Sequence, residues 1–200
     1  MRFQAGLPSD EFESTIGWQA LREPAVQNIA RETRVLSFAL LCVVAISWYL
    51  LGVSPLRFFR VEGGILGLLA LLISFVLLII FHELIHASIH PNFGASRDSV
   101  LGASLRPFMF YACYQGSLPR NRFIAILLAP FIGLTVVPLV AHAVGLFGES
   151  IVGTVALLST LNAAMACVDI FGVYLLLQQV PRNAQVRNKG WLTYWQRKAT

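Results

Sequence analysis

The chain alternates long apolar runs with shorter polar segments. Four of the runs approach or exceed the roughly 20 residues that a helix needs to cross a bilayer. They cover residues 35–54, 61–90, 123–147 and 151–180. Hydrophobic residues make up 56% of the 200-residue chain and charged residues only 12%, a balance too apolar for a water-soluble domain. We therefore predict an α-helical polytopic membrane protein with about four transmembrane helices.

The polar segments divide the chain into three parts. Residues 1–34 are a mixed-charge lead-in, residues 35–180 are the membrane domain, and residues 181–200 are a basic tail. Between spans two and three lies an insert, residues 92–122, in which aromatic and aliphatic residues are interrupted by glycine and proline. This composition favours a short β-hairpin over a helix. The hairpin is either a packing element with an aromatic anchor at the membrane surface or a sheet edge that pairs with an extended substrate.

Basic residues are unevenly distributed between the two sides that four spans would define. The lead-in, the insert and the tail share one side, and they carry all 15 lysines and arginines except Arg57 and Arg60. The positive-inside rule then predicts that both termini are cytoplasmic, and a prokaryotic plasma membrane is the expected location. This topology, with attraction to anionic lipid headgroups, explains the net charge of +5. We therefore expect the lipid bilayer as a partner and no nucleic acid.

Two histidines and a glutamate near the end of span two form the pattern His82-Glu83-Leu84-Ile85-His86. Residues four apart lie on the same face of a helix, so both imidazoles can reach one metal ion. Glu83, beside the first histidine, can point at a metal-bound water and act as its base. Because the chain has only four histidines, this pattern is a strong signal for a site that holds one Zn²⁺ ion.

A catalytic zinc site normally has three protein ligands and an open position. Apart from Glu83, Asp169 is the only acid deep within a predicted span, where an unpaired carboxylate would cost on the order of 3 kcal/mol. Spans two and four both run inward, so Asp169 has a depth compatible with the histidine pair, whereas His142 and Glu149 lie toward the far face. His90 could join the site only if the helix broke before it. Asp169 is the predicted third ligand, and the alternative is a plain hydrogen bond between helices.

A polar stripe is expected on the fourth span. Ser159, Asn162 and Asp169 share one helical face by their spacings of three and seven residues, and this stripe could face the metal. Asn162 could then orient a substrate carbonyl or stabilise an oxyanion. An asparagine in a membrane helix also commonly holds neighbouring helices together, and spacing alone does not decide between these roles.

Taken together, these features resemble the putative zincin peptidases, a domain-of-unknown-function family related in plan to the site-2 proteases. The resemblance rests on the histidine motif, the aromatic insert and three further stretches, which are Gly17-Trp18 with Arg22-Glu23-Pro24, Leu128-Ala129-Pro130-Phe131, and Asn162-Ala163-Ala164 leading to Asp169. It implies an intramembrane zinc metallopeptidase. In that reading His82, His86 and Asp169 are the ligands and Glu83 is the catalytic base. The chain lacks the Leu-Asp-Gly and Asn-Pro-Asp-Gly ligand motifs of site-2 proteases, and Val168 stands before the aspartate where the family often has glycine.

We therefore expect hydrolysis of peptide bonds in membrane-embedded or membrane-anchored polypeptides, near the cytoplasmic face of the bilayer. A helical substrate must first be locally unwound, and the 92–122 insert is the expected place for that step. The alternative is a non-enzymatic membrane protein with a structural, sensing or transporting zinc site, although Glu83 would then have no task. The sequence leaves the substrate, the cut site, the regulatory partners and the oligomeric state open.

Overall fold

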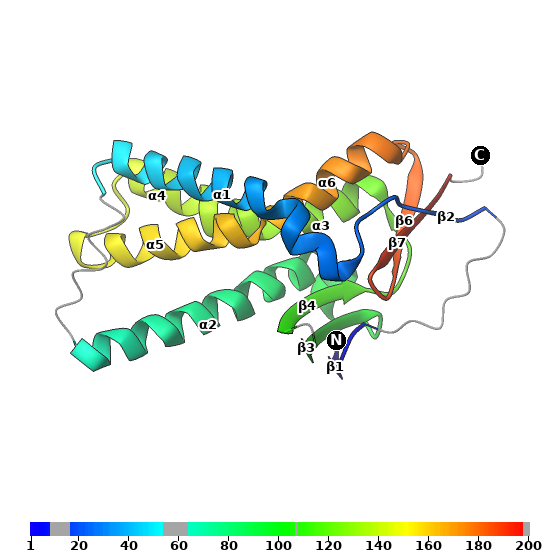
Figure 1. Cartoon of the computed structure of the whole chain (residues 1–200), viewed down its shortest axis with the longest axis horizontal. Helices are drawn as coiled ribbons and strands as arrows, with labels where there is room; N and C mark the ends of the chain where they lie inside the picture. The colour runs from blue at the N-terminus through cyan, green and yellow to red at the C-terminus, as the bar shows by residue number, and fades with distance from the viewer. Residues whose placement is uncertain (9–16, 54–63, 107, 198–200) are drawn as a thin grey trace. The chain divides into compact units, whose positions relative to one another are not determined.

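The computed structural model describes residues 1–8, 17–53, 64–106 and 108–197 (Figure 1). The described helices are α1 (Val26–Leu50), α2 (Gly64–Ile89), α3 (Arg120–Phe131), α4 (Val137–Ala143), α5 (Glu149–Met165) and α6 (Cys167–Gln179), with the shorter segments η2 (Pro91–Gly94) and η3 (Ile132–Val136). The described strands are β1 (Arg2–Ala5), β2 (Gln19–Ala20), β3 (Ser99–Leu105), β4 (Phe108–Tyr114), β5 (Leu118–Pro119), β6 (Ala184–Lys189) and β7 (Leu192–Arg197).

Three described helical stretches are long and apolar enough to cross a membrane. They are α1, residues Ile65–Ile89 of α2, and Arg120–Ala143, which runs from α3 through η3 to α4. Helices α5 and α6 pass the same test as a bent pair, which makes four candidate spans if the pair counts as one. Length and composition therefore agree with the predicted helical architecture. Helix α1 begins at Val26, before the predicted first span, and the last residue of that span lies outside the described residues.

The chain divides into two compact units, each with its own apolar core. The first unit consists of Met1–Glu32, Glu83–Ala129 and Val168–Thr200, and the second consists of Thr33–His82 and Pro130–Cys167.

The described strands belong to the first unit and form two sheets. Strands β3 and β4 pair antiparallel, which confirms the hairpin predicted within residues 92–122. β1 pairs parallel with the other side of β3, so β4 forms the opposite edge of this sheet. The second sheet has the order β2-β7-β6-β5, and its β6–β7 hairpin is built from the segment that the sequence identified only as a basic tail.

The lead-in is tied to the second sheet by Glu23. Its carboxylate accepts hydrogen bonds from the backbone N–H of Thr193 at 2.6 Å and from the Thr193 hydroxyl at 3.2 Å. Burial raises the pKa of Glu23 to about 7, although these two hydrogen bonds act in the opposite direction. The apolar core of this unit joins α3, α6 and the second sheet, with Leu118, Phe123, Ile126, Leu176, Val180 and Val186 among its buried members.

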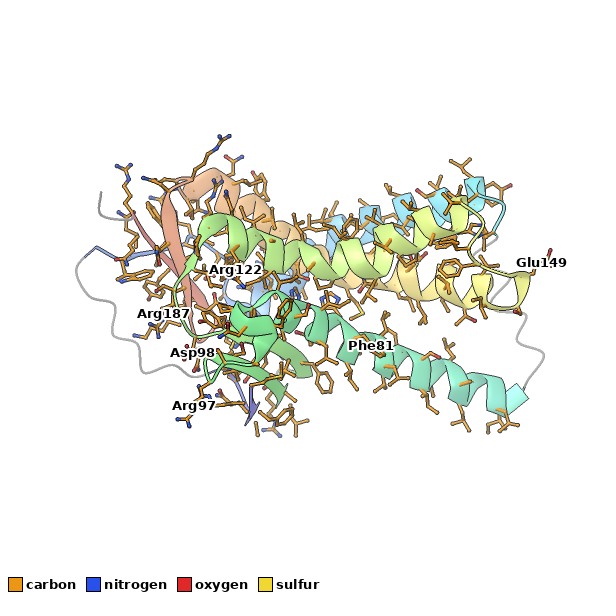
Figure 2. All side chains as sticks on the ribbon, turned by 180° about the vertical axis from the view of Figure 1, so that it is seen from behind. Phe81, Arg97, Asp98, Arg122, Glu149 and Arg187 are labelled. Carbon is orange, nitrogen blue, oxygen red and sulfur yellow. The ribbon has the colours of Figure 1, made fainter. Side chains whose placement is uncertain are left out.

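The second unit is built around Trp48 of α1. The indole is fully buried and donates a hydrogen bond from Nε1 to the Ser159 hydroxyl of α5 at 3.1 Å. Large apolar side chains along α2 are exposed, among them Phe81, which Figure 2 labels. A continuous exposed apolar surface of this kind marks an interaction with lipid or with another apolar partner.

Local sequence explains how α2 ends. Pro91 lies two residues after Ile89, the last residue of α2, and starts the η2 turn. The turn needs a glycine at residue 94, because Gly94 has φ +77° and a Cβ there would lie 2.7 Å from the Ala87 carbonyl oxygen.

The fourth predicted span is not one continuous helix. Helix α5 ends at Met165 and α6 begins at Cys167, so Asn162 and Asp169 belong to different helices. The predicted single polar stripe is therefore wrong, because the regular 3.6-residue period is interrupted at Ala166. The break places Asp169 in the first turn of α6, where the helix dipole stabilises a carboxylate.

Candidate metal centre

The three predicted ligands come together in the structure. His82, His86 and Asp169 each offer one ligand atom, and these atoms lie within 4.8 Å of one another. The two histidines are one turn apart on α2 and are each 5% exposed. Among the described residues, this is the one group of three or more histidine, cysteine, aspartate or glutamate side chains whose ligand atoms lie close enough to hold a metal ion.

The spacing between His86 and Asp169 suits shared coordination better than a direct ion pair. His86 Nε2 and Asp169 Oδ1 are 3.4 Å apart. A charge-assisted hydrogen bond is shorter, about 2.7–2.9 Å. Two ligands bound to one tetrahedral Zn²⁺ at about 2.1 Å stand roughly 3.4 Å apart. Two imidazoles and one carboxylate also match the ligand chemistry of catalytic zinc sites, so these residues fit the metal.

His86 is oriented by a backbone carbonyl that a proline has made available. Its Nδ1 lies 2.8 Å from the carbonyl oxygen of Ile126 in α3. In a regular helix that oxygen would accept the N–H of residue 130, but Pro130 has none. Because a carbonyl can only accept, His86 must carry its proton on Nδ1, which leaves Nε2 to coordinate the metal.

His82 is oriented in the same way by Asn162. The Asn162 side-chain oxygen lies 2.9 Å from His82 Nδ1. The amide orientation is fixed by its other end, because Nδ2 donates to the Pro130 carbonyl at 3.0 Å and to the Thr135 hydroxyl at 2.9 Å. Both imidazoles therefore present Nε2 as the ligand atom, and each is held by a hydrogen bond from its other nitrogen.

The amide of Asn162 is thus engaged in a network within the protein. Its side chain is fully buried, and its two amide hydrogens have partners in Pro130 and Thr135. The oxyanion role stays a prediction. The contacts support the alternative reading from the sequence, in which the asparagine holds neighbouring helices.

Ser159 has partners of its own. Its hydroxyl accepts from Trp48 and donates to the Thr135 carbonyl at 3.4 Å. Thr135 in turn donates to the Ser159 carbonyl at 3.1 Å. Ser159 therefore holds the π-helical segment η3 in place, and Thr135 of this segment accepts a hydrogen bond from Asn162.

Glu83, the predicted base, follows His82 on α2 and is half-buried. The other two histidines lie outside the metal group, in agreement with the prediction. His142 lies 3.3 Å from the Leu51 carbonyl through Nε2, and its ring packs against Trp48 with centroids 5.3 Å apart.

His90 connects the end of α2 to the first sheet. Its Nδ1 lies 3.2 Å from the Ser99 hydroxyl, and its ring centroid lies 5.6 Å from that of Tyr114. Ser99 and Tyr114 are paired across β3 and β4. Burial lowers the pKa of His90 to about 4, so the imidazole is neutral at pH 7. The end of the β-hairpin is thus attached one turn beyond His86.

Sequence reasoning missed two residues that position the ligands, Ile126 and Thr135. Ile126 acts through its backbone, so its side chain carries no signal. The signal that could have identified it is Pro130, because a proline in a helix leaves the carbonyl four residues earlier without its usual donor. Thr135 lies in η3, whose π-helical hydrogen bonding a sequence pattern does not indicate.

Comparison with known protein families agrees with this site. A family model described as "Putative zincin peptidase" matches residues 75–185, which is more than half of the chain. The chain belongs to this family. The match includes all three candidate ligands but not the lead-in. No curated protein and no solved structure matches the chain. Family membership supports a peptidase-like function, with zinc as the metal that the group of His82, His86 and Asp169 could hold.

Proposed function

We propose that the protein is an intramembrane zinc metallopeptidase, similar in plan to site-2 proteases, that hydrolyses peptide bonds of membrane-associated polypeptides near the cytoplasmic face. One observation carries the proposal. Two imidazoles are held by their Nδ1 atoms, and the carboxylate of Asp169 lies within coordination range. Three ligands in a preset arrangement are what a catalytic site needs, since the fourth position is then left for water or substrate.

When bound, zinc would supply an acidified water and would polarise the scissile carbonyl. Glu83 is next to the first ligand in sequence and half-buried, so its carboxylate is suited to take a proton from the attacking water. The same carboxyl group then returns the proton to the leaving amine. Asn162 and Ile126 keep both imidazoles in one orientation throughout, so little reorganisation is needed during the reaction.

A membrane location is supported by the surface of α2. Ile65, Leu66, Ile73, Val76 and Phe81 are each more than half exposed. In water, this much contiguous apolar surface would be strongly unfavourable, whereas lipid would cover it. Two of the three candidate ligands, His82 and His86, lie near the C-terminal end of this helix, which agrees with chemistry close to one membrane face.

The β3–β4 hairpin is the proposed site of substrate pairing. A peptide bond in a transmembrane helix is shielded, so the substrate must adopt an extended conformation before it is cut. β4 lies at the edge of its sheet, and a sheet edge can pair with an extended peptide through main-chain hydrogen bonds. His90 attaches the end of this hairpin one turn beyond His86, and the hairpin belongs to the same unit as His86 and Asp169.

The test compares wild type with a Glu83→Gln variant. We expect the variant to retain zinc and to lose cleavage of membrane-anchored polypeptides, because the amide cannot accept the proton. Membrane peptides from cells that express either protein are compared by mass spectrometry, with Glu149→Gln as a control that makes the same chemical change at an exposed residue. Peptides that accumulate uncut only with Glu83→Gln support the proposal. Undiminished cleavage by that variant refutes it.

The rival function is a structural, sensing or transporting zinc site. Protein variants distinguish it from the peptidase. A structural zinc site usually has four protein ligands, and the group found among the described residues has three. Metal analysis of His86→Ala and Asp169→Ala should show loss of zinc under either function. Only the peptidase requires Glu83, so identical membrane peptides with and without the Glu83 carboxylate favour the rival.

A further inference from the structure

A pocket lies at the start of α3, within the first unit. It has a volume of about 620 Å³ and is lined by Arg120, Asn121, Leu177, Val180, Pro181 and Arg182. The lining combines two guanidinium groups and one amide, and it contains no acidic residue.

Arg120 is the unusual member of this lining. The residue is only 6% exposed, and its Nε is enclosed without a hydrogen-bond partner. Among the described residues, no ion pair is formed by Arg120, and the described carboxylates of Glu23, Glu32 and Asp169 are engaged by other groups. The guanidinium of Arg120 is therefore a positive charge within the protein. A buried charge that lacks a protein partner indicates a bound anion.

The backbone adds to the positive potential of the pocket. Arg120 and Asn121 are the first residues of α3, a helix of 12 residues with no acidic residue in its first turn. The N–H groups of a helix N-terminus attract oxyanions, phosphate above all. Arg182 contributes a second guanidinium from the segment after α6 and is itself exposed. Figure 2 labels Arg122, also in the first turn of α3, but this side chain donates to the Ile89 carbonyl.

The remaining lining is apolar. Leu177 lies near the end of α6 and is 57% exposed, and Val180 follows the last residue of that helix. One turn earlier on the same face of α6, Tyr174 is 55% exposed. The pocket thus joins a cationic half to an exposed apolar strip, which matches a ligand with an anionic head and a hydrocarbon tail.

We propose that this pocket binds an anionic phospholipid, with the phosphate held by Arg120, Arg182 and the start of α3 and an acyl chain along α6. A candidate membrane span begins at Arg120, so the pocket lies at the level where lipid phosphates are found. The proposal requires the membrane location but not the hydrolytic activity.

The test measures lipid retention by native mass spectrometry of the full protein in detergent. Phosphatidylglycerol and phosphatidylcholine are added separately, and wild type is compared with R120Q and with R97Q. Arg97 is exposed and lies outside the pocket, so R97Q makes the same charge change elsewhere in the unit. We expect wild type and R97Q to retain phosphatidylglycerol in preference to phosphatidylcholine. R120Q should bind phosphatidylglycerol roughly ten- to hundredfold more weakly, because charge-assisted contacts are lost.

Several outcomes would overturn the proposal. R120Q and R97Q could retain phosphatidylglycerol equally, or wild type could bind both lipids alike. Sodium phosphate could raise the midpoint of thermal unfolding of wild type but not that of R120Q, while added phosphatidylglycerol leaves both midpoints unchanged. The pocket would then be a site for a free anion. If R120Q does not fold, R182Q replaces it, since Arg182 is exposed and its loss should weaken phosphatidylglycerol binding by roughly tenfold. Unchanged binding by R182Q would then refute the proposal.

Discussion

Replacing Pro130 by alanine should affect metal binding and stability in opposite directions. The new residue has a backbone N–H, and its natural acceptor in α3 is the Ile126 carbonyl oxygen. That oxygen lies 2.8 Å from His86 Nδ1 in the structure. Alanine should therefore draw the carbonyl toward the helix axis and away from the imidazole.

The two magnitudes follow from ordinary contributions. Loss of a partner to a metal-ligating histidine typically costs 10- to 100-fold in metal affinity. We expect about tenfold, or about 1.4 kcal/mol, because a carbonyl oxygen can accept a second hydrogen bond. A proline in a helix interior is about 3 kcal/mol less favourable than alanine. Part of this difference is offset by the greater chain entropy of the unfolded variant, so the metal-free protein should gain about 1–2 kcal/mol of stability.

Zinc affinity is measured by competition with a fluorescent chelator in detergent, and stability by thermal unfolding of the metal-free protein. Pro138→Ala is the matched control. Pro138 lies in the first turn of α4, and the carbonyl that it leaves without a helical donor is a different one from the Ile126 carbonyl that contacts His86. The reasoning is refuted if Pro130→Ala binds zinc as tightly as wild type, or if Pro138→Ala weakens binding equally.

Three further outcomes follow from other contacts. Asn162→Leu should weaken zinc binding by about 10- to 100-fold through loss of the partner of His82, and equal affinity in the same competition assay would contradict this. Burial raises the pKa of Glu23 from 4.5 to about 7, so the folded protein binds the proton of this carboxyl group more tightly than the unfolded chain does. The contribution of the protonated group to the free energy of unfolding is therefore complete below about pH 4.5 and is lost as the pH rises through about 7. Between about pH 4.5 and 7 the free energy of unfolding of wild type should fall by up to about 3 kcal/mol more than that of Glu23→Gln, as measured by thermal unfolding. The same pH profile for both proteins would count against a buried carboxyl group at residue 23. Trp48→Ala should cost about 3–5 kcal/mol in equilibrium unfolding, because the indole is fully buried, and a loss below about 1 kcal/mol would show that the second core is loosely packed.

Local sequence was sufficient for features that depend on residues close together in the chain. His82 and His86 share a face of α2 because they are four residues apart, and Pro91 ends that helix because it has no backbone N–H. The hairpin within residues 92–122 follows from its alternation of strand-forming and turn-forming residues. The apolar runs likewise predicted where long helices occur, since hydrophobicity over about 20 residues depends on composition alone.

Only the tertiary structure brought Asp169 within range of the histidine pair and placed it in the first turn of a separate helix. Residues 154–171 contain neither proline nor glycine, so no local signal marks the break at Ala166. The same holds for the Ile126 carbonyl and for Arg120. Whether a carbonyl meets a histidine, or a guanidinium is buried without a partner, depends on contacts between residues far apart in the chain. Such contacts are selected by packing of the whole unit, whereas a sequence pattern reports only the preferences of neighbours.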